Sequence, residues 1–450
     1  MSDRDRADAV YEALLARAGE RWVQPRKERT ARILTLLDDP QRTYRVVHIT
    51  GTNGKTSTAR MIESLLRAHG LRTGLFTSPH LERFTERIMI DGEPIDDGAI
   101  ADAWDEIEPF VGIVDAELEG AGDAALTFFE LLTVLAFVAA ADAPIDVLVL
   151  EVGMGGEWDS TNTADGDVAV FAPIDIDHAD RLGDTIEAIA EVKAGIIKEG
   201  AAVVSAQQPD EVAAVLRRVA AEKSATIAFE GADFGLAEQK LAVGGQLLTV
   251  RGLAGQYVEE YLPLYGAHQG HNAALAVAAV ESLIGGGSQA IAGDIITEGF
   301  QGATSPGRLQ LLGIAPTVVV DAAHNPHGAT ALAQALDDSF DFDEWGVVLG
   351  ILSDKDASGI VSVLAPAAAH VFATAPESER ASDADVIADL VEQAGHRATV
   401  HPSLAEAADA AREWAASSDR RAVVIAGSVV LAGEAIALAE EEDWKSGWRA

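Results

Sequence analysis

The chain has 450 residues, 48% of them hydrophobic, so it is long enough for two or three packed domains. Acidic residues outnumber basic residues by 72 to 33, giving a net charge of -39, and such a surface repels nucleic acid and anionic lipid. The sequence contains no cysteine, which excludes disulfides, thiol nucleophiles and thiolate metal sites.

The N-terminal segment "MSDRDRADAV" is charged and has no apolar core, so it does not predict a signal peptide. An apolar run over residues 131–153 is interrupted by Asp142, Pro144 and Asp146, so it predicts a buried helix, a turn and a buried strand. We therefore expect a soluble, cytoplasmic monomer that binds small molecules and neither nucleic acid nor membrane.

Helices are predicted first, over residues 11–19 and 25–37. Apolar runs then alternate with helical stretches, as in a parallel sheet covered on both faces. The predicted strands are residues 44–50, 72–78, 146–153, 167–177 and 200–206, and the helices between them include residues 56–70 and 127–141.

The pattern changes after residue 229. A hairpin is predicted over residues 236–253, turning at Gly244 and Gly245, and a helix over residues 272–284. We place a domain boundary in the Gly/Ser/Pro-bearing segment that follows, near residue 300. Beyond it, further strands are predicted over residues 317–323, 345–352, 370–375, 397–402 and 421–428.

The segment "HITGTNGKTST" is nearly a phosphate-binding loop, although Ile49 stands where the usual pattern has its first glycine. A predicted strand precedes it and an amphipathic helix follows. Glycines let backbone amides approach phosphate oxygens, Lys55 supplies a positive charge and Thr56 can bind Mg²⁺. The alternative is an ordinary strand-to-helix turn. The residues expected to bind phosphate are Gly51, Thr52, Asn53, Gly54, Lys55 and Thr56.

The predicted fold class is therefore α/β. Residues 1–300 form a mostly parallel sheet domain that carries the phosphate loop, and residues 301–450 form a smaller, Rossmann-like α/β domain.

Polar side chains stand where the predicted strands end, the edge at which parallel sheets bind ligands. Ser78 follows the second strand, Glu151 ends the third, and His178 follows the fourth. Each has an ordinary alternative, such as a turn cap for Ser78. Together with Thr56 they offer oxygen and imidazole donors at one edge, which suits Mg²⁺. Lys193 lies on a predicted helix just after this cluster, where a surface lysine is the simpler alternative.

The motifs resemble those of the folylpolyglutamate synthase/dihydrofolate synthase family, which belongs with the Mur ligases as ATP-dependent amide-forming enzymes. The resemblance extends from about Glu28 to Ser428. The matching motifs, in the family's order, are "HITGTNGKTST", "TSPHLERFTERI", "LEVGMGGEWDSTN", "IDIDHADRLGDTIEAIAEVKAGIIK", "GAHQGHNAALA", "SPGRLQ", "DAAHNPHG" and "GILSDKD".

In the family, the first glycine of the loop stands at the position of Gly51, so the loop has not lost a required glycine at Ile49. The resemblance implies that Lys55 and Thr56 hold the β- and γ-phosphates of ATP and Mg²⁺. It implies, further, that Ser78 and Glu151 bind the first Mg²⁺.

For the second Mg²⁺, the resemblance implies His178 as a ligand. Lys193 matches a lysine that is carbamylated in the family, which would turn a cation into an anionic oxygen ligand.

The remaining implied roles fall on both sides of residue 300. Asn272 resembles an adenine contact, with a helix N-cap as the alternative. Arg308 resembles a phosphate-binding arginine and Asp321 a nucleotide-site acid. His324 and Ser428 resemble contacts for the incoming glutamate, although Ser428 is alternatively a helix cap.

By this resemblance, the protein joins L-glutamate to a folate carboxylate through an acyl phosphate, using ATP and two Mg²⁺ ions. The expected acceptors are tetrahydrofolate, its polyglutamates and dihydropteroate. Residues 301–450 would form the glutamate-ligase domain. The residues expected to act in catalysis are Lys55, His178, Lys193, Arg308 and His324.

Two alternatives stay open. A Mur-type ligase acting on a UDP-muramoyl peptide would need a UDP-binding domain before the phosphate loop, and about fifty residues precede it here. A nucleotide-dependent switch without ligase chemistry would not need an acceptor site.

Overall fold

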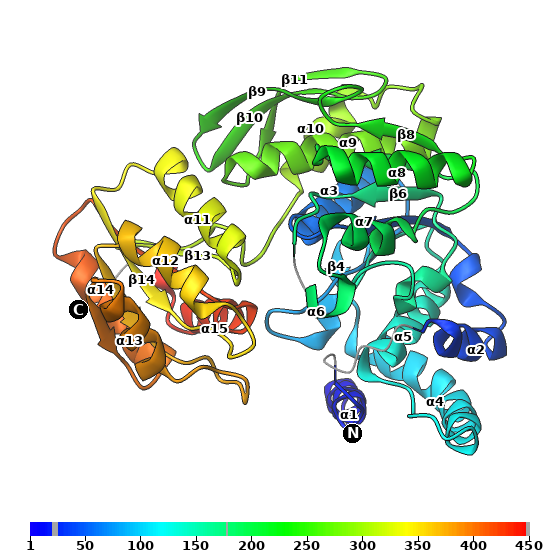
Figure 1. Ribbon diagram of the computed structural model, residues 1–450, viewed down its shortest axis with the longest axis horizontal. Helices are drawn as coiled ribbons and strands as arrows, with labels where there is room; N and C mark the ends of the chain where they lie inside the picture. The colour runs from blue at the N-terminus through cyan, green and yellow to red at the C-terminus, as the bar shows by residue number, and fades with distance from the viewer. Residues whose placement is uncertain (20–25, 177–178, 447–450) are drawn as a thin grey trace.

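The computed structural model describes residues 1–19, 26–176 and 179–446, which form two lobes (Figure 1). An eight-stranded sheet lies in the larger lobe and a six-stranded sheet in the smaller one, and both are mainly parallel. A three-stranded antiparallel sheet packs onto the larger lobe. The predicted α/β class is confirmed.

The larger sheet has the strand order β4-β3-β2-β5-β1-β6-β7-β8, with β3 and β4 antiparallel at one edge. The five strands predicted for this unit form as β1, β2, β5, β6 and β7, whereas β3, β4 and β8 were not predicted. The bounds are β1 Arg45–Thr50, β2 Thr73–Phe76, β3 Ile88–Ile90, β4 Glu93–Pro94, β5 Val147–Glu151, β6 Val168–Phe171, β7 Ala202–Ser205 and β8 Thr226–Phe229.

The strand β6 is shorter than predicted because it stops before Pro173, which has no N–H group for a sheet ladder. The carbonyl of Pro173 instead accepts a hydrogen bond from the backbone N–H of Thr52, at 2.8 Å. The end of β6 therefore supports the phosphate loop.

Alternate residues of β1 face opposite sides of the sheet. Val47 and Ile49 pack with α3, α9 and α10, whereas Val46 packs with α1, α2, α4 and α5. Another apolar core lies under α7 and α8. The bounds are α1 Asp3–Leu15, α2 Glu28–Leu36, α3 Lys55–Ala68, α4 Asp97–Gly120, α5 Phe128–Asp142, α6 Ala179–Leu182, α7 Ile186–Ala194, α8 Asp210–Glu222, α9 Ala267–Gly285 and α10 Gly293–Gln301.

Local sequence signals begin several helices. Thr127 and Glu130 form a capping box at the start of α5, and Thr185 accepts a hydrogen bond from the N–H of Ala188 at the start of α7. These caps satisfy backbone N–H groups that the helix itself leaves without partners.

The predicted hairpin is confirmed as β9 Gly235–Ala242 and β10 Gly245–Arg251. Its turn consists of Val243 and Gly244, one residue earlier than predicted, and Gly244 has a φ of 80°. A third strand, β11 Gln256–Leu262, was not predicted.

The smaller sheet has the strand order β12-β13-β17-β14-β15-β16, and β12 is antiparallel to β13. The five predicted strands form as β13 to β17, while the short edge strand β12 was not predicted. The bounds are β12 Gln310–Ile314, β13 Thr317–Val320, α11 Pro326–Ser339, β14 Glu344–Leu349, α12 Ala357–Ala367, β15 His370–Ala373, α13 Ala384–Gln393, β16 Ala398–Val400, α14 Leu404–Ala416, β17 Arg421–Ala426 and α15 Val429–Glu441.

The predicted domain boundary at residue 300 falls inside α10, one residue before that helix ends. The division of the chain at this point stays a prediction. Among the described residues, no helix has the length and apolar character needed to cross a bilayer.

The two lobes contact each other through the loop after β2. Leu81 of this loop packs against the apolar core formed by α14, α15 and the strands of the smaller sheet. A Cβ on Gly433 of α15 would lie 2.0 Å from the carbonyl oxygen of Leu81. Asn53 of the phosphate loop also hydrogen-bonds His327 of α11, with 2.9 Å between Nδ2 and Nδ1.

The variant Gly433→Ala tests this contact. Alanine favours the helix by about 0.5–1 kcal/mol over glycine, but its methyl group would force Leu81 away from α15. We expect the radius of gyration, measured by small-angle X-ray scattering, to increase while the circular dichroism spectrum stays unchanged.

Gly112→Ala is the matched control, because Gly112 lies in α4 and a Cβ there would have no atom within 4 Å. Its scattering should equal that of the wild type. Identical scattering from both variants would contradict the assigned contact.

Candidate active site

The loop between β1 and α3 turns on two glycines. Gly51 has a φ of 152° and Gly54 a φ of 83°, values that favour glycine. A Cβ on Gly51 would lie 2.7 Å from the Cβ of Ala172, and one on Gly54 would lie 2.8 Å from Oδ1 of Asn272. Ile49 is fully buried within β1. The strand therefore continues through Ile49, and glycine is required two residues later.

The predicted phosphate-binding residues lie together around the start of α3. Thr52 and Asp175 hydrogen-bond twice, since the Thr52 hydroxyl donates to the Asp175 carbonyl and the Asp175 N–H donates to the hydroxyl, both at 3.0 Å. Lys55 Nζ donates to the carbonyls of Gly51 and Thr52, at 3.2 and 3.1 Å. No side chain of the described residues caps α3, so its first N–H groups and the Lys55 ammonium are suited to an anion.

Thr56, Ser78 and Glu151 also lie together. The Thr56 hydroxyl is 3.0 Å from each carboxylate oxygen of Glu151, and the backbone N–H of Ser78 donates to the same carboxylate. Burial raises the pKa of Glu151, a shift that Lys55 and these hydrogen bonds oppose. Within the described ranges Glu151 forms no ion pair. Hydroxyl and carboxylate oxygens around a buried charge fit Mg²⁺.

Lys193 is buried beneath the phosphate loop and is not a surface lysine. Its side chain is 4% exposed, and its Nζ donates to the carbonyl of Gly51 at 2.9 Å. A cavity beside the loop is lined by Lys55 and Lys193, together with Gly153 and Gly155 from the loop after β5. His178, the other predicted metal ligand, lies outside the described residues.

Asn272 lies inside α9, six residues past the helix N-cap Gly266, so the alternative of an N-cap is wrong. Its Nδ2 donates to Oε1 of Gln269 at 3.0 Å, and its Oδ1 faces Gly54, as described above. The side chain of Asn272 thus lies against the phosphate loop. Its contact with adenine stays a prediction.

Across the junction, Arg308 follows Ser305, whose Oγ lies 2.9 Å from Oγ of Ser57 on α3. Asp321 is buried, and its carboxylate accepts hydrogen bonds from the N–H groups of Leu309 and Ala323, at 2.9 and 2.8 Å. It therefore holds the backbone that presents Arg308. Direct contact of Asp321 with a nucleotide stays a prediction.

The two predicted glutamate contacts differ in exposure. His324 is half-buried, with Nδ1 2.9 Å from the carbonyl oxygen of Ala322. Ser428 is fully buried and caps α15 by accepting a hydrogen bond from the N–H of Leu431, at 3.0 Å. The cap is confirmed for Ser428, and a role in binding glutamate stays a prediction for both residues.

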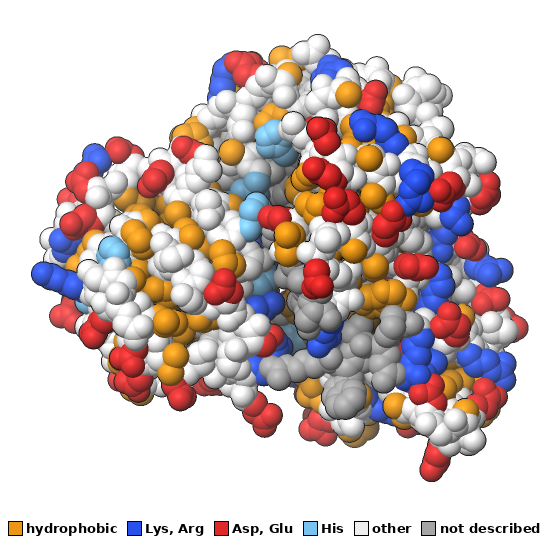
Figure 2. Space-filling model, viewed as in Figure 1, with side chains coloured by type: hydrophobic (Ala, Val, Ile, Leu, Met, Phe, Trp, Pro, Cys, Tyr) orange, Lys and Arg blue, Asp and Glu red, His pale blue; other side chains and the backbone are white. Residues whose placement is uncertain are grey.

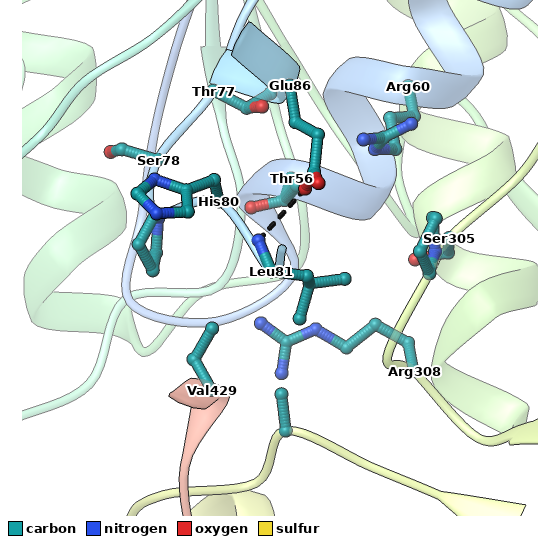
Figure 3. A pocket seen from close by; sticks show the side chains of 13 residues that line it. Thr56, Arg60, Thr77, Ser78, His80, Leu81, Glu86, Ser305, Arg308 and Val429 are labelled. Atoms are coloured by element: carbon teal, nitrogen blue, oxygen red, sulfur yellow. Dashed lines mark hydrogen bonds between the residues drawn. The ribbon is translucent and has the colours of Figure 1, made fainter. Parts of the chain in front are cut away.

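A second cavity lies between the lobes, next to Thr56 and Ser78 (Figure 3). The figure shows Arg60 from α3 and Arg308 from the smaller lobe among its walls. Histidine side chains gather along the same junction (Figure 2). Burial, and then the charge of Arg308, lower the pKa of His268 there to about 4. His268 is therefore neutral near pH 7, and the positive charge that this junction presents in an acidic protein comes from Arg60 and Arg308.

Three ionisable residues of this cavity were not predicted, namely Arg60, His80 and Glu86. The spacing of Arg60 from Thr56 could have identified it, because residues four apart share one face of a helix. His80 lies on the loop after β2 and Glu86 in a short 3-10 helix, Phe84–Arg87, so neither has a helical or strand spacing that marks it as part of the cavity.

Comparison with known protein families identifies the general class to which this protein belongs. Residues 49–280 match the Mur ligase middle domain, and residues 307–429 match the Mur ligase glutamate ligase domain. The fold and the phosphate loop therefore belong to a Mur-type ligase of two lobes.

Individual relatives narrow this class. The chain is 44% identical over 444 residues to a dihydrofolate synthase/folylpolyglutamate synthase of Mycobacterium tuberculosis, covering 92% of this chain and 91% of that one. A folylpolyglutamate synthase structure from the same organism, complexed with ADP, superposes with a TM-score of 0.92 at 42% identity, covering 97% and 99%. FolC of Escherichia coli, in complex with DHPP and ADP, gives a TM-score of 0.83 at 28% identity, covering 97% and 98%. The chain belongs to the folylpolyglutamate synthase/dihydrofolate synthase family.

The variant Lys55→Ala tests the phosphate loop. It removes the ammonium from the loop while Gly51 and Gly54 keep its shape, so we expect ATP turnover to fall at least about 100-fold. The thermal unfolding midpoint should change little, because within the described part of the chain Lys55 donates only to loop carbonyls. Lys223→Ala, at an exposed position after α8, is the matched control. Turnover of Lys55→Ala near that of the control would contradict the assignment.

Proposed function

We propose that the protein is an ATP-dependent ligase that joins L-glutamate to a carboxylate of a folate through an acyl phosphate. The observation that supports this proposal most directly is the arrangement of residues at the junction between the lobes. The phosphate loop and the Thr56–Glu151 pair lie on one lobe, and Arg308 lies across the inter-lobe cavity on the other. Family membership gives the substrate class.

The nucleotide would lie along the start of α3, with its phosphates against the loop and Lys55. Relatives of this chain bind ADP, according to their structures. Asn272 and Asp321 are our candidates for further nucleotide contacts.

Thr56, Ser78 and Glu151 would hold one Mg²⁺ ion, because the Thr56 hydroxyl contacts the Glu151 carboxylate and the backbone of Ser78 lies beside the same carboxylate. A second ion would be bound by His178 and by Lys193 in its carbamylated form. Bound Mg²⁺ would offset the negative charge of the transferring phosphoryl group.

The folate carboxylate and the γ-phosphate of ATP are both anions, so the first step requires positive charge between them. An oxygen of the folate carboxylate attacks the γ-phosphorus, the bond to the bridging β,γ-oxygen breaks, and ADP leaves. The neutral amine of glutamate then attacks the acyl phosphate, forming the amide and releasing phosphate and one proton. Lys55 and Arg308 would stabilise the charge on the phosphoryl group. Contact between the lobes would exclude water from the acyl phosphate.

The chain should also accept dihydropteroate, because its relatives in Mycobacterium tuberculosis, Bacillus subtilis and Escherichia coli carry both synthase names. Dihydropteroate carries its carboxylate on a benzoyl ring, whereas tetrahydrofolate ends in glutamate. One site would thus phosphorylate two kinds of acid.

Mass spectrometry of the products tests this function. With ATP, Mg²⁺ and L-glutamate, we expect tetrahydrofolate and dihydropteroate each to gain one glutamyl residue, with one ADP formed per amide. Wild-type enzyme that makes amides only from a UDP-muramoyl substrate, or binds ATP without making any amide, would overturn the proposal.

The variant Lys193→Ala tests the carbamate. Alanine removes the group that would carry the carbamate, so we expect turnover to fall at least about 100-fold, as for loss of one strong electrostatic contact. Added formate or acetate should restore part of the activity by replacing the carbamate. Rescue should be absent in Lys55→Ala, which keeps Lys193. Unchanged activity of Lys193→Ala would contradict the role.

A further inference from the structure

Arg60 is a half-buried arginine that faces the inter-lobe cavity (Figure 3). Among the described residues, its guanidinium forms no hydrogen bond and no ion pair within 4.0 Å. Burial lowers its pKa, and the nearby carboxylates of Glu86, Glu63 and Glu151 oppose that shift. A desolvated guanidinium that opens onto a cavity is suited to an anionic ligand.

The carboxylates near Arg60 already have other partners. Glu86 accepts hydrogen bonds from the backbone N–H groups of residues 81, 82 and 83, at 2.9, 3.1 and 2.7 Å. Glu63 accepts from Arg67 at 3.0 Å and from Thr73 at 2.6 Å. Arg60 therefore remains able to bind a ligand without breaking a described ion pair.

The two cavities at this junction share no lining residue. The cavity with Lys55 and Lys193 adjoins the phosphate loop, whereas the cavity with Arg60 is lined by Thr56 and Arg308. Phosphate binding accounts for the first cavity, and the second is where an organic acceptor would meet the transferring phosphoryl group.

Arg60 lies four residues after Thr56 on α3, so the two side chains share one face about one helical turn, or 5.4 Å, apart. In an extended glutamyl group the α- and γ-carboxylates lie about 5 Å apart, from C–C bonds of ~1.5 Å. We propose that Arg60 binds the unreacted α-carboxylate of a glutamyl-bearing acceptor while its γ-carboxylate is phosphorylated beside Thr56. This inference rests on the proposed function.

The proposal makes Arg60 a determinant of acceptor choice. Dihydropteroate has a single carboxylate, which must react, so it has no group for Arg60 to bind. Loss of Arg60 should therefore weaken one activity and leave the other.

Steady-state kinetics of Arg60→Gln test this directly. For tetrahydropteroyl-monoglutamate we expect the KM to rise about 10- to 100-fold, as for a lost hydrogen bond between charged groups. The KM for dihydropteroate, ATP and L-glutamate should stay within about twofold of wild type. Arg72→Gln is the matched control, since Arg72 follows α3 and forms an exposed ion pair with Asp91 at 3.4 Å.

A chemical variant of the acceptor gives a test that does not depend on folding of the mutant. Wild-type enzyme should bind the α-amide of tetrahydropteroyl-monoglutamate about 10- to 100-fold more weakly than the free acid. Arg60→Gln should not distinguish the two compounds, and Arg60→Lys should retain part of the preference.

Three results would overturn the inference while leaving the function intact. These are wild-type enzyme that uses acid and amide equally, a rise in KM for L-glutamate with both acceptors, and an unchanged KM for the folate acceptor in Arg60→Gln. Wild-type enzyme that makes no amide from any folate would instead overturn the proposed function itself.

Discussion

The buried carboxylate of Glu151 constrains the site more than any other group. It ends β5 at 2% exposure, and two other segments supply its hydrogen bonds, namely α3 through Thr56 and the end of β2 through Ser78. Desolvating a carboxylate is costly unless donors or a cation compensate it. The sheet order places β1 and β2 on either side of β5, so the segments that follow them reach one carboxylate.

Much of the site follows from sequence because strand ends and helix starts are local features. Gly51 and Gly54 are recognisable from the loop, and Glu151 from its place after an apolar run. Arg60 and β12 were missed because their roles depend on which helix face meets the second lobe and on pairing at a sheet edge. Asn272 was ambiguous because the start of α9 is set by Gly266, well before it. The four-residue spacing from Thr56 marks the helix face of Arg60, but which face meets the second lobe and which strand pairs at a sheet edge are tertiary features without a local pattern.

The electrostatics of the junction differ from those of the whole chain. A net charge of -39 opposes anionic substrates at long range, and salt screens exposed charges beyond about 10 Å. Lys55 and Arg308 lie close to where phosphates and carboxylates are proposed to bind, and partial burial makes their local field stronger. Substrate recognition therefore depends on the placement of a few cations and not on the sum of charges.

Leu81 belongs in sequence to the loop that carries Ser78, yet it packs against the apolar core of the other lobe. Only two residues separate Ser78, beside the Glu151 carboxylate, from this hydrophobic contact. If a bound cation orders Ser78, it also favours the packing of Leu81 against the smaller lobe. By thermodynamic linkage, packing of Leu81 favours cation binding by the same free energy. Occupancy of the catalytic centre and apposition of the lobes are thus thermodynamically linked through one short stretch of backbone.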